Sequence, residues 1–62
     1  MKKVWYLYRN GLCFGQRDDA MTAIREICQL SDKEIPSMPS LVIASGQYNS
    51  GEYSTIKEKV KY

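Results

Sequence analysis

Two short stretches at the start of the chain alternate between large apolar and polar residues on either side of an Asn-Gly pair. Residues 2–9 and 12–16 have the two-residue period and the aromatic content of β-strands. Asn10 and Gly11 between them suit a type I′ turn, because both central positions of that turn need a positive φ. The pattern therefore predicts a β-hairpin with a two-residue turn.

The register of this hairpin sorts its side chains onto two faces. The predicted pairs are Arg9 with Leu12, Tyr8 with Cys13, Leu7 with Phe14 and Trp5 with Gln16. One face then carries Trp5, Leu7, Leu12 and Phe14, and the other carries Val4, Tyr6, Tyr8 and Cys13. Because large apolar residues occupy both faces and a small domain buries only one of them, the second face needs an explanation.

Residues 19–30 have apolar positions at helical spacing. Their stripe consists of Ala20, Ile24, Ile27 and Ser31, flanked by Met21 and Cys28. Asp18 is the predicted N-cap, and Asp19 adds negative charge to the first turn. A capping-box pattern at residues 31–34 predicts a short extra helical turn. We expect the stripe to cover the hairpin face that carries Trp5, which holds the larger and less polar side chains.

The second half of the chain predicts two more strands. Pro36 and Pro39 favour an extended connector, residues 41–45 form a short apolar run typical of a strand, and residues 46–51 predict a loop. Residues 52–62 alternate again, and we expect Ile56 and Val60 to face the core. The prediction is a small α+β domain, ββαββ, spanning residues 1–62, with one helix packed on one face of a mostly antiparallel four-stranded sheet.

In this arrangement the uncovered sheet face is rich in tyrosine and edged by lysine. Tyr6 and Tyr8 come from the hairpin, and Lys57, Lys59 and Lys61 come from the last strand. One explanation is a solvated face, because tyrosine tolerates water in strands and edge lysines discourage aggregation. A second is a protein contact, since tyrosine is enriched at the energetic centres of interfaces. A third is nucleic acid, with rings stacking on bases and lysines meeting phosphates.

We expect a non-enzymatic protein that contacts a larger protein partner through this face, as an inhibitor or modulator. The expected contact residues are Tyr6, Tyr8, Lys57, Lys59 and Lys61, with Arg9 and Tyr48 at the rim. The alternative is a single-stranded nucleic-acid-binding domain that uses the same residues. Small accessory proteins of phages and mobile elements have a similar format, and many cover a surface of a host enzyme; the analogy is one of size and organisation.

Composition limits the chemistry that this chain can carry. It has no histidine, which removes the commonest general base and metal ligand, and its two cysteines lie fifteen positions apart without companions for a zinc site. Gly46 and Gly51 have the spacing of a phosphate loop, but Glu52 stands where that loop needs lysine. We expect no cofactor, no metal and no catalytic residue. A net charge of +2 is too small to indicate a nucleic-acid partner by itself.

Length and apolar content set the remaining expectations. The N-terminal apolar run covers five residues, short of a secretory signal, and no stretch approaches a membrane span. We therefore expect a cytoplasmic protein with reduced thiols and no membrane partner. A chain of 62 residues buries a small core, so a homodimer is possible on stability grounds.

Overall fold

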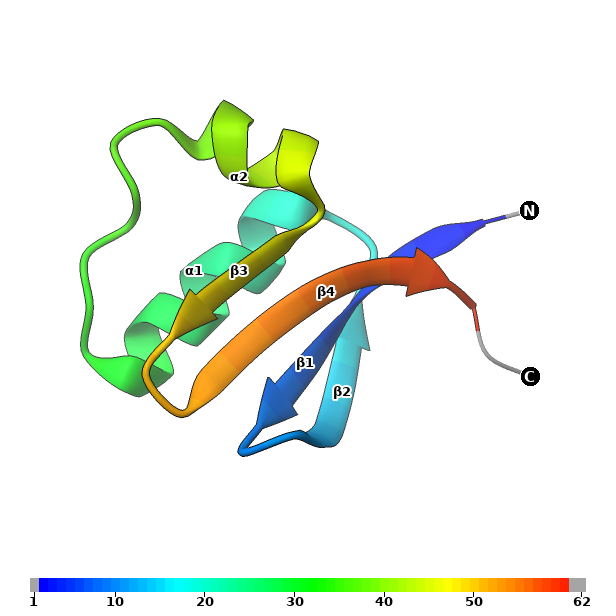
Figure 1. Cartoon of the computed structure of the whole chain (residues 1–62), viewed down its shortest axis with the longest axis horizontal. Coiled ribbons are helices and arrows are strands. Elements are labelled where there is room, and N and C mark those ends of the chain that lie inside the picture. The colour runs from blue at the N-terminus through cyan, green and yellow to red at the C-terminus, as the bar shows by residue number, and fades with distance from the viewer. Residues whose placement is uncertain (1, 61–62) are drawn as a thin grey trace.

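An open antiparallel sheet with one helix packed on it forms the body of the molecule (Figure 1). The computed structural model describes residues 2–60. Its elements are β1 (Lys3–Arg9), β2 (Leu12–Arg17), α1 (Ala20–Ser31), α2 (Pro39–Ser45), β3 (Gln47–Ser50) and β4 (Tyr53–Lys59). The strand order is β2-β1-β4-β3, and every neighbouring pair is antiparallel. The predicted α+β class, with one helix on a four-stranded sheet, is confirmed.

The hairpin turn forms as predicted, but the register of the hairpin changes halfway along it. Asn10 and Gly11 have φ values of 51° and 82°, as a type I′ turn requires. The first two predicted pairs of the hairpin are confirmed. Beyond them the ladder shifts, so that Leu7 pairs with Gly15 and Phe14 is an extra residue. This β-bulge makes the predicted pairing of Leu7 with Phe14 wrong and moves Gln16 from Trp5 to Tyr6.

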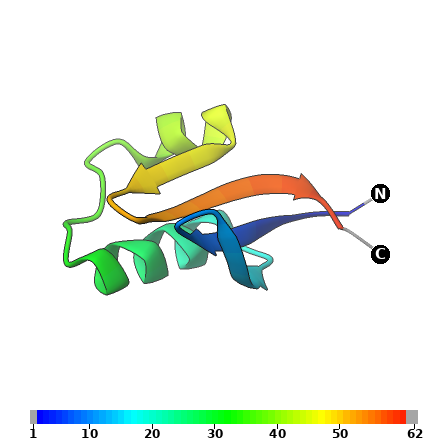
Figure 2. The same ribbon diagram turned by 60° about the horizontal axis from the view of Figure 1, so that its bottom comes forward.

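The core lies between α1 and the two central strands. Trp5 and Leu7 of β1 pack against Ala23 and Ile27 of α1, and all four are buried. Ile24 is also fully buried, as the helical stripe predicted. Figure 2 shows α1 lying along one side of the sheet. The opposite face of the sheet, within residues 2–60, has no helix packed on it.

Two residues predicted for the core are instead on the surface. Leu12 is 75% exposed and Phe14 is 45% exposed. Both belong to β2, which forms one edge of the sheet, whereas α1 packs mainly across the central strands β1 and β4. A single helix is too narrow to cover four strands, so the side chains of the edge strand remain partly in solvent.

The ends of α1 each lie one residue later than predicted. The N-cap is Asp19, whose carboxylate accepts a hydrogen bond from the backbone N–H of Thr22 at 3.0 Å. Asp18, the predicted cap, instead forms an ion pair with Lys2. At the other end, Asp32 adopts the left-handed conformation with φ 58°, and its N–H bonds back to the last turn. This left-handed residue ends the helix, so the predicted extra turn at residues 31–34 is absent.

The apolar run at residues 41–45 is a helix and not the predicted strand. Pro39 stands at the start of α2, where its missing N–H costs nothing, and Gly46 with φ 77° terminates the helix. The strand follows in the segment predicted as a loop, because Gln47–Ser50 form β3. The remaining turn consists of Gly51 and Glu52, which join β3 to β4.

The last strand has the opposite facing from the one we expected. In the β1–β4 ladder Tyr6 is opposite Ile56, while Trp5 is opposite Lys57. Residues that face each other across a ladder point to the same side, so Lys57 shares the helix-bearing face and Ile56 the uncovered one. The core position is taken by Thr55, which is fully buried and donates a hydrogen bond to the Tyr6 carbonyl at 2.8 Å. A polar residue satisfied in this way is not recognisable as core from hydropathy.

Candidate functional site

The tyrosines predicted to contact a partner are less accessible than the pattern suggested. Tyr6 is only 6% exposed, and Val4 beside it on the uncovered face is 1% exposed. Tyr8 is half-buried, and its hydroxyl donates to Glu58 Oε2 at 3.1 Å. Because Tyr8 is opposite Ser54 and Glu58 is opposite Val4, this bond extends along the sheet past the Tyr6–Ile56 pair. On the face without a helix, the side chains of neighbouring strands therefore shield Val4 and Tyr6 from solvent.

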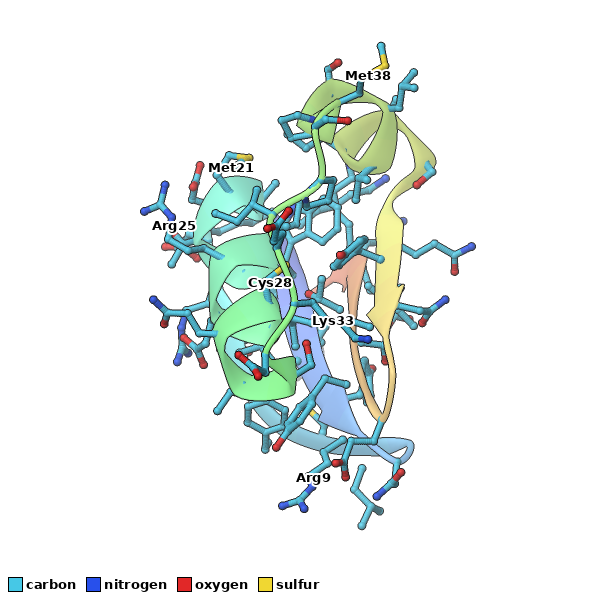
Figure 3. All side chains as sticks on the ribbon, turned by 90° about the vertical axis from the view of Figure 1, so that its left-hand side faces the viewer. Arg9, Met21, Arg25, Cys28, Lys33 and Met38 are labelled. Carbon is cyan, nitrogen blue, oxygen red and sulfur yellow. The ribbon has the colours of Figure 1, made fainter. Side chains whose placement is uncertain are left out.

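Tyr48 is half-buried on the helix-bearing face of the sheet. It pairs with Thr55, which places it on the helix-bearing face, and it packs against the core. Its hydroxyl oxygen lies 3.6 Å from the sulfur of the buried Cys28 thiol. The hydrogen bond with Cys28, and then burial, raise the pKa of Tyr48 above its usual value. Figure 3 shows Cys28 behind the segment that connects α1 to α2.

The lysines of β4 are exposed but lie on the other side of the sheet from Tyr6 and Tyr8. Lys57 is opposite Trp5, and Lys59 is opposite Lys3. The predicted single surface of tyrosine and lysine is therefore wrong in its geometry. Lys61 lies outside the described residues. Whether any of these residues binds a partner stays a prediction.

Arg9 is the predicted rim residue that the structure places at an open surface feature. Its Nε donates to Glu52 Oε2 at 2.9 Å, and its guanidinium carbon lies 5.6 Å from the centre of the Tyr53 ring. Asn10 also donates to Glu52, at 3.3 Å. The hydrogen bond from Arg9 lowers the pKa of Glu52 and raises the pKa of Arg9. The two side chains are thus held ionised beside Tyr53.

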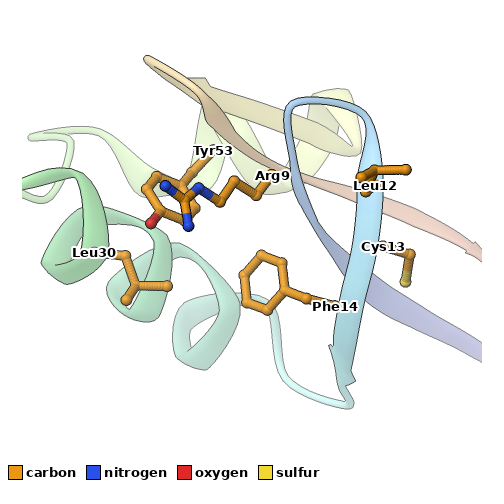
Figure 4. A pocket seen from close by; sticks show the side chains of 6 residues that line it. All are labelled: Arg9, Leu12, Cys13, Phe14, Leu30 and Tyr53. Atoms are coloured by element: carbon orange, nitrogen blue, oxygen red, sulfur yellow. The ribbon is translucent and has the colours of Figure 1, made fainter.

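An apolar groove lies next to this ion pair, between the hairpin and the C-terminal half of α1. We call it the hairpin groove; its volume is about 410 Å³, and its lining residues are Arg9, Leu12, Cys13, Phe14, Leu30 and Tyr53. Figure 4 shows Phe14 extending from β2 toward Leu30 of α1, with Tyr53 and Arg9 beside them. The Phe14 and Tyr53 rings meet edge to face, with centroids 6.1 Å apart and an interplanar angle of 80°.

The groove is shallow and offers contact area instead of reactive groups. Leu30 is 48% exposed and Phe14 is 45% exposed, so the groove opens widely to solvent. The only charged side chain in its lining is Arg9, which Glu52 already neutralises. Cys13 is an exposed free thiol on its margin. Among residues 2–60 no cluster of three potential metal ligands occurs. The chemistry available here is hydrophobic and aromatic contact.

Sequence reasoning identified Arg9 of this groove but missed Phe14, Leu30 and Tyr53. Phe14 was assigned to the core because the regular register places it opposite Leu7. Gly15 directly after it was the available signal, since glycine in a strand often marks a bulge. Leu30 carried a signal too, because it lies off the apolar stripe of α1. Tyr53 faces Arg9 through the β1–β4 ladder, a pairing between the two ends of the chain with no local signal.

Comparisons of the chain with protein-family models, with curated protein sequences and with solved structures found no match. Of the two helices in residues 2–60, neither has the length and apolar character needed to cross a bilayer.

Proposed function

We propose that this chain is a non-enzymatic binding protein that docks on a larger protein through the hairpin groove. The observation that carries the proposal is that exposed apolar side chains of two elements and the half-buried Tyr53 of a third gather around one depression. Leu12 and Phe14 come from β2, Leu30 from α1 and Tyr53 from β4. By covering part of its partner's surface, such a protein acts as an inhibitor or modulator.

The composition of the groove supports a protein partner. Aromatic residues and arginine are enriched in the buried centres of protein interfaces, and Phe14, Tyr53 and Arg9 lie side by side here. The Phe14–Tyr53 and Arg9–Tyr53 contacts hold these rings in place before binding, which reduces the entropy lost on association. The lack of histidine in the whole chain supports the non-enzymatic part of the proposal.

The test compares two leucine substitutions that differ only in where they lie. Leu30→Ser removes apolar area from the groove, whereas Leu41→Ser does so on α2, where Leu41 is 62% exposed and outside the groove. A partner is captured from native cells with the original chain, and its Kd is then measured for both variants. We expect Leu30→Ser to weaken binding at least about 5-fold and Leu41→Ser to leave it unchanged. Equal effects of the two changes would contradict the proposal.

A second candidate function has its own observation. Lys3, Lys57 and Lys59 share one face of the sheet, and among residues 2–60 no carboxylate lies within ion-pair distance of them. Lys2, Arg9 and Arg17, in contrast, are each paired with an acidic residue. Three unpaired lysines on neighbouring strands suit the phosphates of a nucleic-acid strand. Stacking on Tyr6 has no support, because that ring is buried.

Salt dependence tests this alternative. If the three lysines contact phosphates, changing all of them to alanine reduces the slope of log K against log salt by about 2 to 3. The matched control is Lys33→Ala, which removes an exposed lysine beyond the end of α1. The measurement is the fluorescence anisotropy of dye-labelled, mixed-sequence single-stranded DNA titrated with the protein at several salt concentrations, because Trp5 is buried and does not report surface contacts. An unchanged slope in the triple variant argues against nucleic acid.

A further inference from the structure

One edge of the sheet is open where the hairpin groove lies. β2 pairs only with β1, and Figure 1 shows no element beyond it within the described part of the chain. An edge strand turns its unpaired N–H and C=O groups outward, ready to pair with another strand. The opposite edge has fewer backbone groups for an added strand, because β3 has only four residues and closely follows α2.

The sequence of β2 lacks the lysine and proline that block strand addition, while its bulge and its inward-turned Arg17 are features that protect an edge. Between Leu12 and Arg17 there is no lysine and no proline, and the only charge is Arg17. That charge is satisfied within the chain: the Arg17 guanidinium donates to both carboxylate oxygens of Glu26 at 3.0 and 2.9 Å and to the Gln16 carbonyl of β2 at 2.6 Å. The bulge at Phe14 and Gly15 brings the Phe14 ring to the groove beside this edge.

The groove lies where the side chains of an added strand would point. A strand added to β2 would run about 4.8 Å beyond it, with alternate side chains on the helix-bearing face. Phe14 and Leu30 border the groove on that face, so one apolar side chain of the incoming strand would rest between them. The six residues of β2 extend over about 20 Å, which corresponds to a segment of five or six residues.

Charge determines what kind of segment fits. The two guanidiniums nearest the groove and the edge, those of Arg9 and Arg17, are each neutralised within the chain by Glu52 and Glu26. The site therefore presents apolar surface without a net charge, which complements an uncharged segment and disfavours an acidic or basic one.

We propose that the β2 edge binds an extended, uncharged, apolar segment of the partner protein as a fifth strand, with one of its side chains seated on Phe14 and Leu30. This inference rests on the proposed function and specifies how the hairpin groove is used. Main-chain hydrogen bonds to β2 would supply affinity, and the groove would supply selectivity.

A peptide library tests the proposal without knowledge of the partner. The immobilised chain is used to select from displayed eight-residue peptides built from apolar and small uncharged residues, with a second library that carries Lys or Glu at alternate positions. We expect enrichment from the uncharged library only. No enrichment from it, or preferential enrichment of charged peptides, would overturn the proposal.

The mode of binding is tested on the selected peptide, so that the protein itself stays unchanged. The peptide is N-methylated at one amide at a time, which removes one main-chain donor in each case. Because a strand directs alternate amides toward its neighbour, we expect methylation to weaken binding at least 10-fold at every second position and hardly at all between them. An effect without alternation would overturn strand addition.

The same peptide separates this inference from the proposed function. If Leu30→Ser weakens binding and Leu41→Ser does not, but N-methylation shows no alternation, the groove binds the segment and strand addition is wrong. If methylation alternates while both leucine variants bind equally, the edge binds a strand and the proposed groove is wrong. Sedimentation of the chain alone is expected to give a monomer. A dimer that the peptide dissociates would make a second copy the occupant and overturn the proposal.

Discussion

At the scale of single residues, burial and not residue type decides the role of each aromatic and aliphatic side chain. Trp5 and Leu7 meet α1 in the core, while Tyr6, their neighbour in sequence, is buried on the other side of the sheet among strand side chains. Phe14 and Leu30 are as apolar as any of these, yet each is nearly half exposed at the hairpin groove.

Ile24 gives the residue-scale prediction. It is fully buried in α1, so Ile24→Ala removes three carbon atoms from a close-packed environment and should destabilise the fold by about 2–5 kcal/mol. A domain of this size gains only about 3–5 kcal/mol from one core, so this variant should lose most of its stability. Urea denaturation followed by circular dichroism measures the effect. Leu30→Ala is the control and should cost less than about 1 kcal/mol, and equal midpoints for the two variants would contradict the assignment.

At the scale of elements, the sequence predicts those elements correctly whose own residues strongly prefer one conformation. The Asn10-Gly11 turn and the period of α1 formed as predicted, because positive φ and an apolar stripe are strong preferences of short segments. The prediction of a strand at residues 41–45 is wrong because a run of four apolar residues followed by Ser45 suits a strand or a helix equally. The proline before it and the glycine after it are also the start and end signals of a short helix.

Two adjacent aspartates give the element-scale prediction. Asp19 caps α1 through the Thr22 N–H, whereas Asp18 is exposed and forms only a surface ion pair with Lys2. Asp19→Ala should therefore destabilise the protein by about 0.5–2 kcal/mol, because the N-terminal N–H groups of α1 lose their acceptor. Asp18→Ala should cost well under 1 kcal/mol. Thermal unfolding of both variants measures the difference, and the reverse order would show that Asp18 is the cap.

At the scale of the whole molecule, the connection from α1 to α2 protects an interior that the sheet and α1 alone would leave open. The Cys28 sulfur of α1 lies 3.6 Å from both the Glu34 carbonyl oxygen in that connection and the Tyr48 hydroxyl oxygen of β3, so its thiol is enclosed by three parts of the chain. Ser31 and Ser50 add a hydrogen bond between α1 and β3 at 2.7 Å. Cys13 has no such cover and is exposed on β2.

Thiol reactivity gives the whole-molecule prediction. In native buffer a maleimide should modify Cys13 within minutes and leave Cys28 unmodified, because Cys28 is 1% exposed. In denaturant both of the chain's cysteines should react. Mass spectrometry of intact protein counts the labels, and peptide mapping locates them. Two labels in native buffer would mean that the 32–38 connection opens readily.

The features that depend on neighbouring residues follow from the sequence: the hairpin turn, the existence of α1, and the α+β class that their order implies. It also identified Arg9 as a surface residue of interest. The strand order, the facing of β4 and the position of Tyr53 beside Phe14 and Leu30 emerge only from the folded chain. Those features depend on pairing between β1 and β4, more than forty residues apart in the chain. The free energy of such a pairing depends on contacts between the two segments, so the sequence of either segment alone does not predict it.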